Sequence, residues 1–228
     1  MKRSEINAAI RWAEALAEEH RITLPRFARF PADPALFAAP ERKNLRETLL
    51  GWDVTDFGSG DFAHVGAVLF TVRNGSVHDP SIGTPYAEKY IFLRDGACQE
   101  IPMHYHITKT EDIINRAGGI FCCQVAMRDK DGAPDMTRSV RLLRDGEEYV
   151  AAPGEIIEIA VGDSITLEPY VYHRFFAKPG CGDLIIGEVS KINDDSSDNV
   201  FAEVRTYFRP IEEDEARYRL LGFEYNVK

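Results

Sequence analysis

The chain has 228 residues, of which 44% are hydrophobic and 28% are charged, a composition typical of a folded protein of one or two domains. Its 27 Lys and Arg residues against 37 Asp and Glu residues give a formal net charge of −10. We therefore expect neither a nucleic acid nor an anionic membrane surface as a partner, because both repel an acidic protein.

The N-terminal part predicts helices. Apolar residues recur at helical spacing over residues 1–20, and Ser4 is the expected N-cap. Four prolines between residues 25 and 40 exclude a long regular element there. A second short helix is predicted over Glu41–Leu50.

From Trp52 on, the pattern changes to short β-rich runs separated by turn residues. Asn-Gly and Asp-Gly pairs follow several runs and are strong signals for hairpin turns. Runs spaced about ten residues apart predict an all-β sandwich or barrel. The predicted strands are Ala67–Val72, Tyr90–Leu93, Phe121–Met127, Val140–Leu143, Tyr149–Val150, Glu155–Val161, Ser164–Leu167, Val171–Phe176 and Leu184–Val189.

We predict three segments within one structural domain: a helical extension over residues 1–50, a barrel over residues 51–209, and a C-terminal segment, 210–228, that packs back on the barrel. No apolar run approaches the roughly 18 residues of a membrane span, no signal-peptide pattern opens the chain, and no C-x-x-C pair occurs. We therefore expect a cytoplasmic protein.

Three histidines and one glutamate form the most informative pattern in the chain. His104 and His106 are two residues apart, so on a strand both imidazoles face the same side. Glu111 follows after a bend, and His173 lies in another strand-like run. Imidazole nitrogens and a carboxylate oxygen suit a divalent first-row metal. We predict a metal site made by these four residues, with up to two positions open to a bidentate diol or hydroxy-carbonyl.

This pattern resembles the two metal motifs of the cupin superfamily. The first motif is carried here by His104, His106, Glu111 and Gly118, and the second by Gly162, Pro169 and His173. The resemblance implies an all-β fold, a cupin β-barrel or double-stranded jelly roll, with flanking helices.

Segments spread over nearly the whole chain resemble the D-lyxose isomerase family of cupin-type sugar isomerases. They are MKRSEIN at the start, GWDVTDFG from Gly51, LFTVRNG from Leu69, YAEK from Tyr86, PMHYH from Pro102, EDIINR from Glu111 and IEEDE from Ile211. The resemblance implies a manganese-dependent aldose–ketose isomerase, a homodimer, that interconverts D-lyxose with D-xylulose and D-mannose with D-fructose.

Such an isomerase moves a proton between C1 and C2 of the sugar, and a metal ion stabilises the enediolate as a Lewis acid. A metal-assisted hydride shift needs the same metal contacts, so both routes stay open at this point. We expect Lys109 and Lys89 to bind sugar oxygens, and Lys109 also to shuttle a proton. Glu188 and Glu213 are the expected carboxylates for proton transfer, Glu188 because it joins an apolar strand face and Glu213 because the resemblance includes its acidic run.

Two other functions use the same fold. A cupin dioxygenase would hold iron at the same ligands, but the lysines and carboxylates near them favour a polyol over an apolar substrate. A non-catalytic sugar-binding cupin is the second alternative. We expect a free, unphosphorylated sugar, because no G-x-x-x-x-G-K-[ST] or G-x-G-x-x-G loop occurs to cradle a phosphate.

Overall fold

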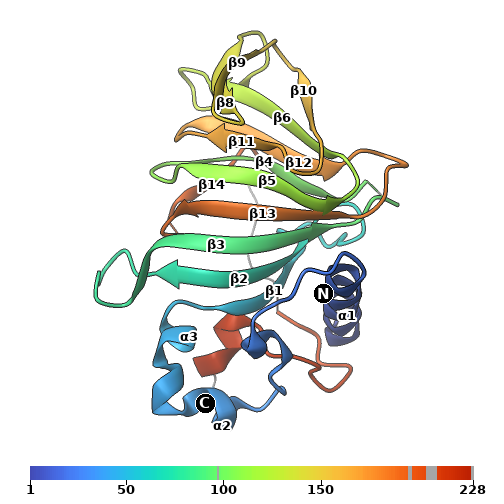
Figure 1. Cartoon of the computed structure of the whole chain (residues 1–228), viewed down its shortest axis with the longest axis vertical. Coiled ribbons are helices and arrows are strands. Elements are labelled where there is room, and N and C mark those ends of the chain that lie inside the picture. Colours follow the sequence, from blue (N-terminus) through green and yellow to red (C-terminus); the bar gives the residue numbers. More distant parts are fainter. Residues whose placement is uncertain (97, 195–196, 204–209, 227–228) are drawn as a thin grey trace.

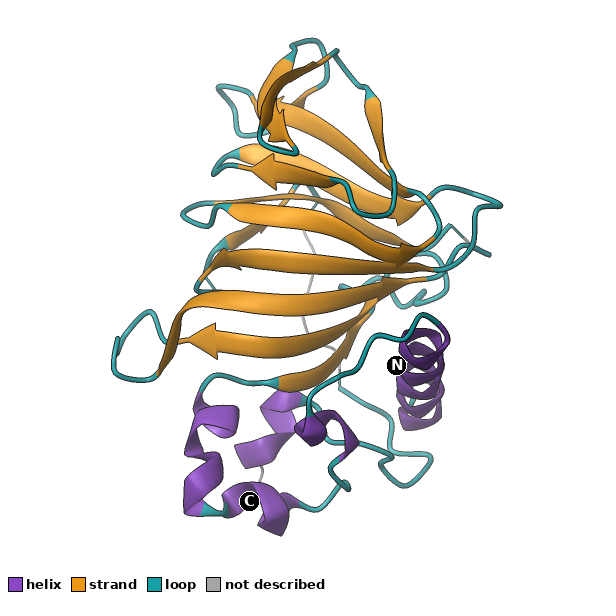
Figure 2. Cartoon of the chain, viewed as in Figure 1, coloured by secondary structure: helices purple, strands orange, loops and turns teal. Residues whose placement is uncertain are grey.

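The structure, a computed structural model, describes residues 1–96, 98–194, 197–203 and 210–226. Two β-sheets face each other, and the helices gather at one end, beside the first strand (Figures 1 and 2). The helical elements are α1 (Arg3–Glu19), η1 (Arg26–Arg29), α2 (Pro34–Ala38), η2 (Pro40–Arg42), α3 (Lys43–Glu47) and η3 (Gly222–Asn226). The strands are β1 (Gly51–Thr55), β2 (Ala67–Gly75), β3 (Gly83–Leu93), β4 (Glu100–His106), β5 (Glu111–Gly118), β6 (Phe121–Arg128), β7 (Pro134–Asp135), β8 (Val140–Arg144), β9 (Glu147–Ala151), β10 (Ile156–Ile159), β11 (Ser164–Leu167), β12 (Val171–Ala177), β13 (Leu184–Lys191) and β14 (Asn199–Phe201).

The first sheet has the strand order β1-β2-β3-β13-β5-β11-β8-β9, and the second has the order β10-β6-β12-β4-β14, with β7 paired to β6. Strands that are distant in sequence become neighbours, as β13 does between β3 and β5. Neighbouring strands run antiparallel in both sheets. The chain thus crosses between the sheets in the manner of a jelly roll, and the prediction of an all-β fold with flanking helices is confirmed.

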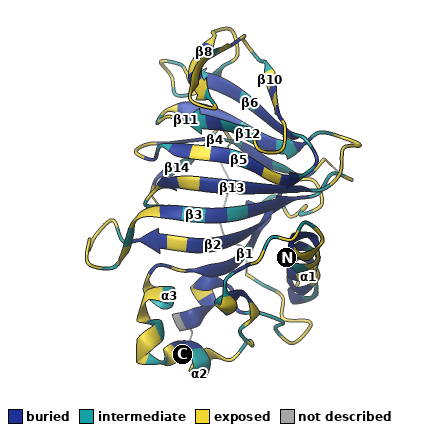
Figure 3. Ribbon diagram, in the orientation of Figure 1, coloured by how far each residue is buried: buried dark blue, intermediate teal, exposed yellow. Residues whose placement is uncertain are grey.

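The main core lies between the two sheets. Alternate residues of each strand point inward, and their apolar side chains form one buried cluster that includes Ile91, Ile113, Phe121, Ile165 and Phe175. Most strand positions are buried, and the exposed residues concentrate in loops (Figure 3). The side chains that carry chemistry interrupt this inward-facing apolar surface.

Helix α1 covers the outer face of the first sheet. Ile6 and Ile10 of α1 are buried in a second cluster with Phe70 and Phe92, which point outward from β2 and β3. The helix begins one residue before the predicted N-cap: Lys2 precedes it, and the Lys2 backbone N–H donates to Glu5. Ser4 lies inside the helix, because its hydroxyl finds a partner in Asp214 instead.

The second predicted helix, over Glu41–Leu50, is shorter than expected. It consists of η2 and α3 and ends at Glu47. Leu49 adopts a left-handed conformation with φ of 53°, which no α-helix continues through.

The turn signals after the predicted strands differ in how closely they mark the turn. Asp145-Gly146 makes the hairpin between β8 and β9, with φ of 52° and 81°, and this prediction is confirmed. A hairpin also follows Asn74-Gly75, because β2 pairs antiparallel with β3, but these two residues end β2 and the turn spans residues 76–82.

Among the described residues, the list of predicted strands omits β1, β4, β5, β7 and β14, although β4 is the strand expected for His104 and His106. β5 points Glu111 and Asn115 inward, which hides its period-two alternation. β7 and β14 have only two and three residues. The division at residues 50 and 209 stays a prediction, and the boundary at 209 lies outside the described residues.

Within the described ranges, no helix has the length and apolar character of a membrane span.

Candidate active site

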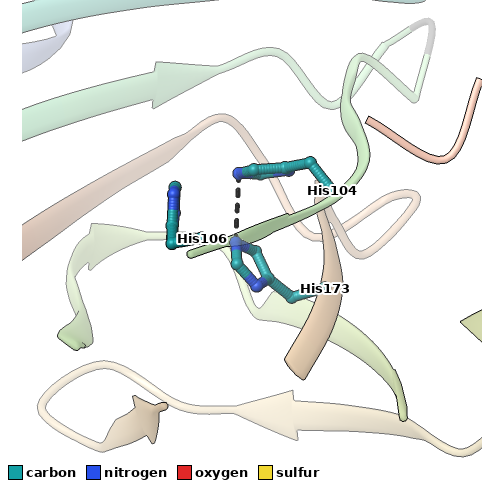
Figure 4. A group of neighbouring side chains, drawn as sticks. All are labelled: His104, His106 and His173. Carbon is teal, nitrogen blue, oxygen red and sulfur yellow. Dashed lines mark hydrogen bonds between the residues drawn. The ribbon is translucent and has the colours of Figure 1, made fainter. Parts of the chain in front are cut away.

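Three imidazoles meet inside the barrel. His104 and His106 come from β4 and His173 from β12, which is the neighbouring strand in the second sheet. His173 pairs directly opposite His104 in the ladder, so both rings enter the same space between the sheets. The Nε2 atoms of His104 and His173 lie 3.0 Å apart (Figure 4). The three rings are buried, and one nitrogen of each lies within 4.8 Å of the others.

The backbone determines which ring nitrogens carry protons. Nδ1 of His104 donates to the carbonyl of Pro102 at 2.8 Å, and Nδ1 of His173 donates to the carbonyl of Val171 at 3.0 Å. Each Nε2 therefore presents a lone pair. Burial holds the pKa of His104 well below its ordinary value and, with the neighbouring positive charges, that of His173 at about 4. Both rings are thus neutral at neutral pH.

Glu111 adds a carboxylate to the same point. Its Oε1 lies 3.2 Å from Nε2 of His173, and its Oε2 lies 3.4 Å from Nε2 of His106. Among the described residues, Oε1 is buried without a hydrogen-bond partner. Burial raises the pKa of Glu111, but the positive charge of Lys109 and the interaction with His106 more than reverse this and hold the pKa well below its usual range.

The lone pairs and the charge at this point fit a bound cation. Lone pairs of His104 and His173 face each other at 3.0 Å, and the Glu111 oxygen beside them is charged and orphaned. Acceptors packed this closely without protons repel one another unless a positive ion lies between them. Imidazole and carboxylate donors together fit a divalent first-row metal, which agrees with the three-histidine cluster.

Two lysines and a second carboxylate lie next to the histidines. Nζ of Lys109 is 2.8 Å from Oε2 of Glu111 and 2.9 Å from Oε1 of Glu188. Lys89 pairs opposite Glu188 in the ladder of β3 and β13, with 3.9 Å between Nζ and Oε1. Lys89, Lys109 and Glu188 are all at least 95% buried. The structure therefore brings together seven of the eight residues selected from the sequence.

The charge of Glu188 is stabilised by its surroundings. Burial raises the pKa of this carboxyl, but the ammonium groups of Lys109 and Lys89 outweigh it and leave the pKa below its usual value. The Ser190 hydroxyl also donates to Oε1 at 2.9 Å. Glu188 is thus a buried carboxylate held in its charged form, which can accept a proton.

Asp198, which the sequence patterns did not indicate, holds the loop that carries Lys109. Its carboxylate accepts from the backbone N–H and hydroxyl of Thr108 at 2.8 and 2.7 Å, and from the backbone N–H of Lys109 at 3.2 Å. It also lies 3.8 Å from Nδ1 of His106. Asp198 stands in an acidic and Ser-rich stretch, so only its contacts reveal this position.

A small cavity of about 40 Å³ lies against the cluster. Its polar side is lined by Lys89, Lys109, Glu111, Glu188, His104, His106 and Asn199, and its apolar side by Phe57, Leu69, Ile91, Ile101, Phe175 and Phe201. The sequence patterns did not indicate Phe57 and Phe201 either, because an isolated aromatic residue in the sequence cannot be distinguished from an ordinary core residue.

The structure does not bring Glu213 to this cavity. Its carboxylate accepts from Arg3 at 2.9 and 3.0 Å and from Arg217 at 2.9 Å. The hydrogen bond from Arg3 and the bond from Arg217 hold the pKa of Glu213 at about 2. Because α1 packs on the outer face of the first sheet, this carboxylate lies with Arg3 outside the barrel. The expected role of Glu213 as a base does not fit this position.

Comparisons with known proteins agree with this geometry. The model of the D-lyxose isomerase family matches residues 1–225. A protein of Serratia proteamaculans named D-lyxose/D-mannose isomerase is 40% identical over 229 residues, which cover 99% of this chain and 98% of the relative. A protein of the same name from Escherichia coli O157:H7 is 38% identical over 226 residues, with 99% and 98% covered.

Among solved structures, the L-ribose isomerase of Acinetobacter sp. DL28 in complex with L-ribose is similar to this chain. The match has a TM-score of 0.56 and 16% sequence identity, and it covers 89% of this chain and 93% of that one. At this identity the likeness concerns the fold, and it confirms the predicted cupin-like double sheet.

Proposed function

The chain belongs to the D-lyxose isomerase family, and from that premise we propose that this aldose–ketose isomerase interconverts D-lyxose with D-xylulose and D-mannose with D-fructose. The observation that carries the proposal is the buried group of three imidazoles beside Glu111, whose carboxylate lies 2.8 Å from the ammonium of Lys109. Three of the four proposed metal ligands and the proposed proton-transfer groups line one cavity, which supports an isomerisation at C1 and C2.

We propose that His104, His106, Glu111 and His173 hold the metal and that the metal is manganese. The mixed nitrogen and oxygen donor set supports a first-row ion over magnesium, which prefers oxygen ligands. When bound, such an ion supplies Lewis-acid polarisation of a carbonyl and stabilises enediolate charge.

The residues around the cluster then divide the remaining work. Lys89 and Lys109 donate hydrogen bonds to sugar oxygens, which orients the C1–C2 edge toward Glu188. Glu188 takes the proton from one carbon and returns it to the other, and Lys109, whose Nζ lies 2.9 Å from Oε1 of Glu188, donates a proton to the sugar oxygen and recovers it. This arrangement favours proton transfer over a hydride shift, because a hydride shift needs no base. Conversion in D₂O distinguishes them: deuterium enters the product at C1 or C2 only by proton transfer.

The alternatives fit the cavity less well. A cupin dioxygenase or a non-catalytic sugar-binding cupin would not require a buried lysine between two carboxylates, a costly arrangement. We also propose a free sugar as substrate, since the two lysines that line the cavity already face Glu111 and Glu188, and the described lining residues offer no further positive charge for a phosphate.

The test is an assay of metal-stripped protein against free sugars. EDTA should inactivate the enzyme reversibly, and manganese should restore more activity than magnesium. Turnover of D-lyxose and D-mannose should exceed turnover of their phosphate esters. Recovery with magnesium alone would argue against the donor set, and oxygen consumption would argue for the dioxygenase.

We propose further that the enzyme is a cytoplasmic homodimer, as the family resemblance implies. Sedimentation velocity on the purified protein tests the assembly, and fractionation of the source cells tests the location.

A further inference from the structure

We propose that Phe57 is a specificity-determining residue, and that its ring sets how long a sugar chain the cavity accepts. The inference rests on the proposed function and adds to it the part of the site that discriminates a pentose from a hexose.

The backbone turns Phe57 into the barrel. Its φ of 49° lies in the left-handed region, which aromatic residues rarely adopt. Hydrogen bonds hold this conformation: the Phe57 N–H donates to the Thr55 hydroxyl at 2.9 Å, and the buried Asp56 carboxylate accepts from Gly58 at 2.9 Å and from Gly60 at 3.0 Å. A residue kept in an uncommon backbone conformation by several bonds is typical of functional positions.

The ring reaches the histidine cluster through one neighbour. Phe57 is 5% exposed, and its ring centroid lies 5.7 Å from that of Phe201. The Phe201 ring in turn lies 5.3 Å from His104. Both phenylalanines line the same cavity as Lys89, Lys109 and Glu188. They form an apolar wall of this cavity, against which the C–H faces of a sugar can pack.

The cavity is too small for a sugar, so part of its lining must move when a sugar binds. Its volume of about 40 Å³ has room for only a few water molecules, whereas small-molecule sites span roughly 300–1,000 Å³. Most lining residues stand on strands that are paired on both sides and cannot move alone. Phe57 follows β1 in a loop, and Phe201 stands on β14 at the edge of its sheet. This wall therefore sets the space for the sugar carbons beyond C1 and C2. Of its two residues, Phe57 is the one that does not stand on a strand.

The experiment compares kcat/KM for D-mannose and D-lyxose in Phe57→Ala, Phe57→Leu and Phe57→Trp. A smaller side chain should favour the longer sugar and raise the mannose-to-lyxose ratio, by about tenfold in Phe57→Ala, which is the discrimination that one carbon provides in an apolar pocket. Phe57→Trp should lower the ratio. Bound manganese should remain unchanged in every variant, because Phe57 offers no ligand.

Phe92→Leu is the matched control. Phe92 is equally buried but packs under α1, in the cluster outside the barrel, so its ratio should equal that of the wild type. Urea unfolding identifies any variant that fails to fold. If Phe57→Ala fails to fold, the more conservative variants Phe57→Leu and Phe57→Trp still decide the question. If folded Phe57→Leu and Phe57→Trp have mannose-to-lyxose ratios within twofold of wild type, the proposed role of Phe57 is refuted, but the proposed function is not. A wild-type enzyme that converts neither sugar would refute the proposed function and this inference with it.

Discussion

Nζ of Lys109 lies 2.9 Å from Oε1 of Glu188, although 79 residues separate the two along the chain. Lys109 stands in the loop between β4 and β5, and Glu188 stands on β13, which pairs with β5. The same ammonium group is 2.8 Å from Glu111. The proposed proton route and the proposed metal ligands therefore share one positive charge.

Removing the ammonium group of Lys109 should reduce catalysis but leave metal binding unchanged. In Lys109→Met the stem is kept and the ammonium is lost, so kcat should fall by about 100- to 10,000-fold, the usual contribution of a positioned acid or base. Bound manganese should stay near one per chain, because the four proposed ligands remain. Lys178→Met, which removes an exposed ammonium paired with Glu158, should leave kcat unchanged. A kcat for Lys109→Met within threefold of wild type would remove Lys109 from the mechanism.

His106→Ala should lose the metal. The substitution deletes one buried imidazole from the cluster, and we expect manganese affinity to drop by at least about 100-fold, more than the loss that a residue behind the ligands causes. Isothermal titration with MnCl₂ measures it. His64→Ala is the control, since His64 is an exposed histidine paired with Asp61. Full manganese occupancy in His106→Ala would contradict the ligand assignment.

Asp198→Asn should weaken the site without removing any proposed ligand. The amide keeps the shape of the side chain but replaces one acceptor by a donor, so it cannot accept from both Thr108 and Lys109 as the carboxylate does. We expect KM to rise and manganese affinity to fall by about 10-fold. Asp129→Asn alters a loop aspartate that likewise accepts two backbone bonds, and it should change neither. Equal effects in both variants would mean that Asp198 only stabilises the fold.

Glu213→Gln should alter how stability depends on pH. The pKa of Glu213 is held at about 2 by Arg3 and Arg217, below its ordinary value of 4.5. A depressed pKa stabilises the folded state above the ordinary value, and this stability is lost as the pH falls toward the folded value. Because the side chain is 44% exposed, we expect a loss of only about 1 kcal/mol at pH 7.

Urea unfolding at a series of pH values checks this. The difference between wild type and Glu213→Gln should be constant above pH 5 and shrink below about pH 4.5. Glu215→Gln, with a similarly exposed carboxylate 3.9 Å from Arg11, should show little difference at any pH. A gap that widens as the pH falls would contradict the ion pair.

The positions of His104, His106 and His173 could be predicted because strand alternation is local and strongly patterned. Two histidines two residues apart must face one side, and a third on a later strand needs only one pairing to join them. Their role as metal ligands stays a prediction. The alternation of β13 likewise placed Glu188 on the inner face of its strand.

Phe57, Asp198 and Glu213 show what local patterns cannot reach. Phe57 points inward because of a left-handed backbone, which no hydrophobic period records. Asp198 acts through backbone N–H groups about 90 residues away, and such donors exist at every position of a chain. Glu213 lies in an acidic run that suggested a mobile base, and its actual partner, Arg3, is 210 residues distant.

The bonds of Arg3 also determine the order in which the molecule can be completed. Arg3 is fully buried, and its carboxylate partners, Glu213 and Glu224, follow it by 210 and 221 residues. A buried guanidinium without partners is unfavourable, so during synthesis on the ribosome α1 cannot dock fully until the last turn of the chain has emerged. The packing of Ile6 and Ile10 of α1 against the first sheet is therefore coupled to a segment more than 200 residues further along the chain.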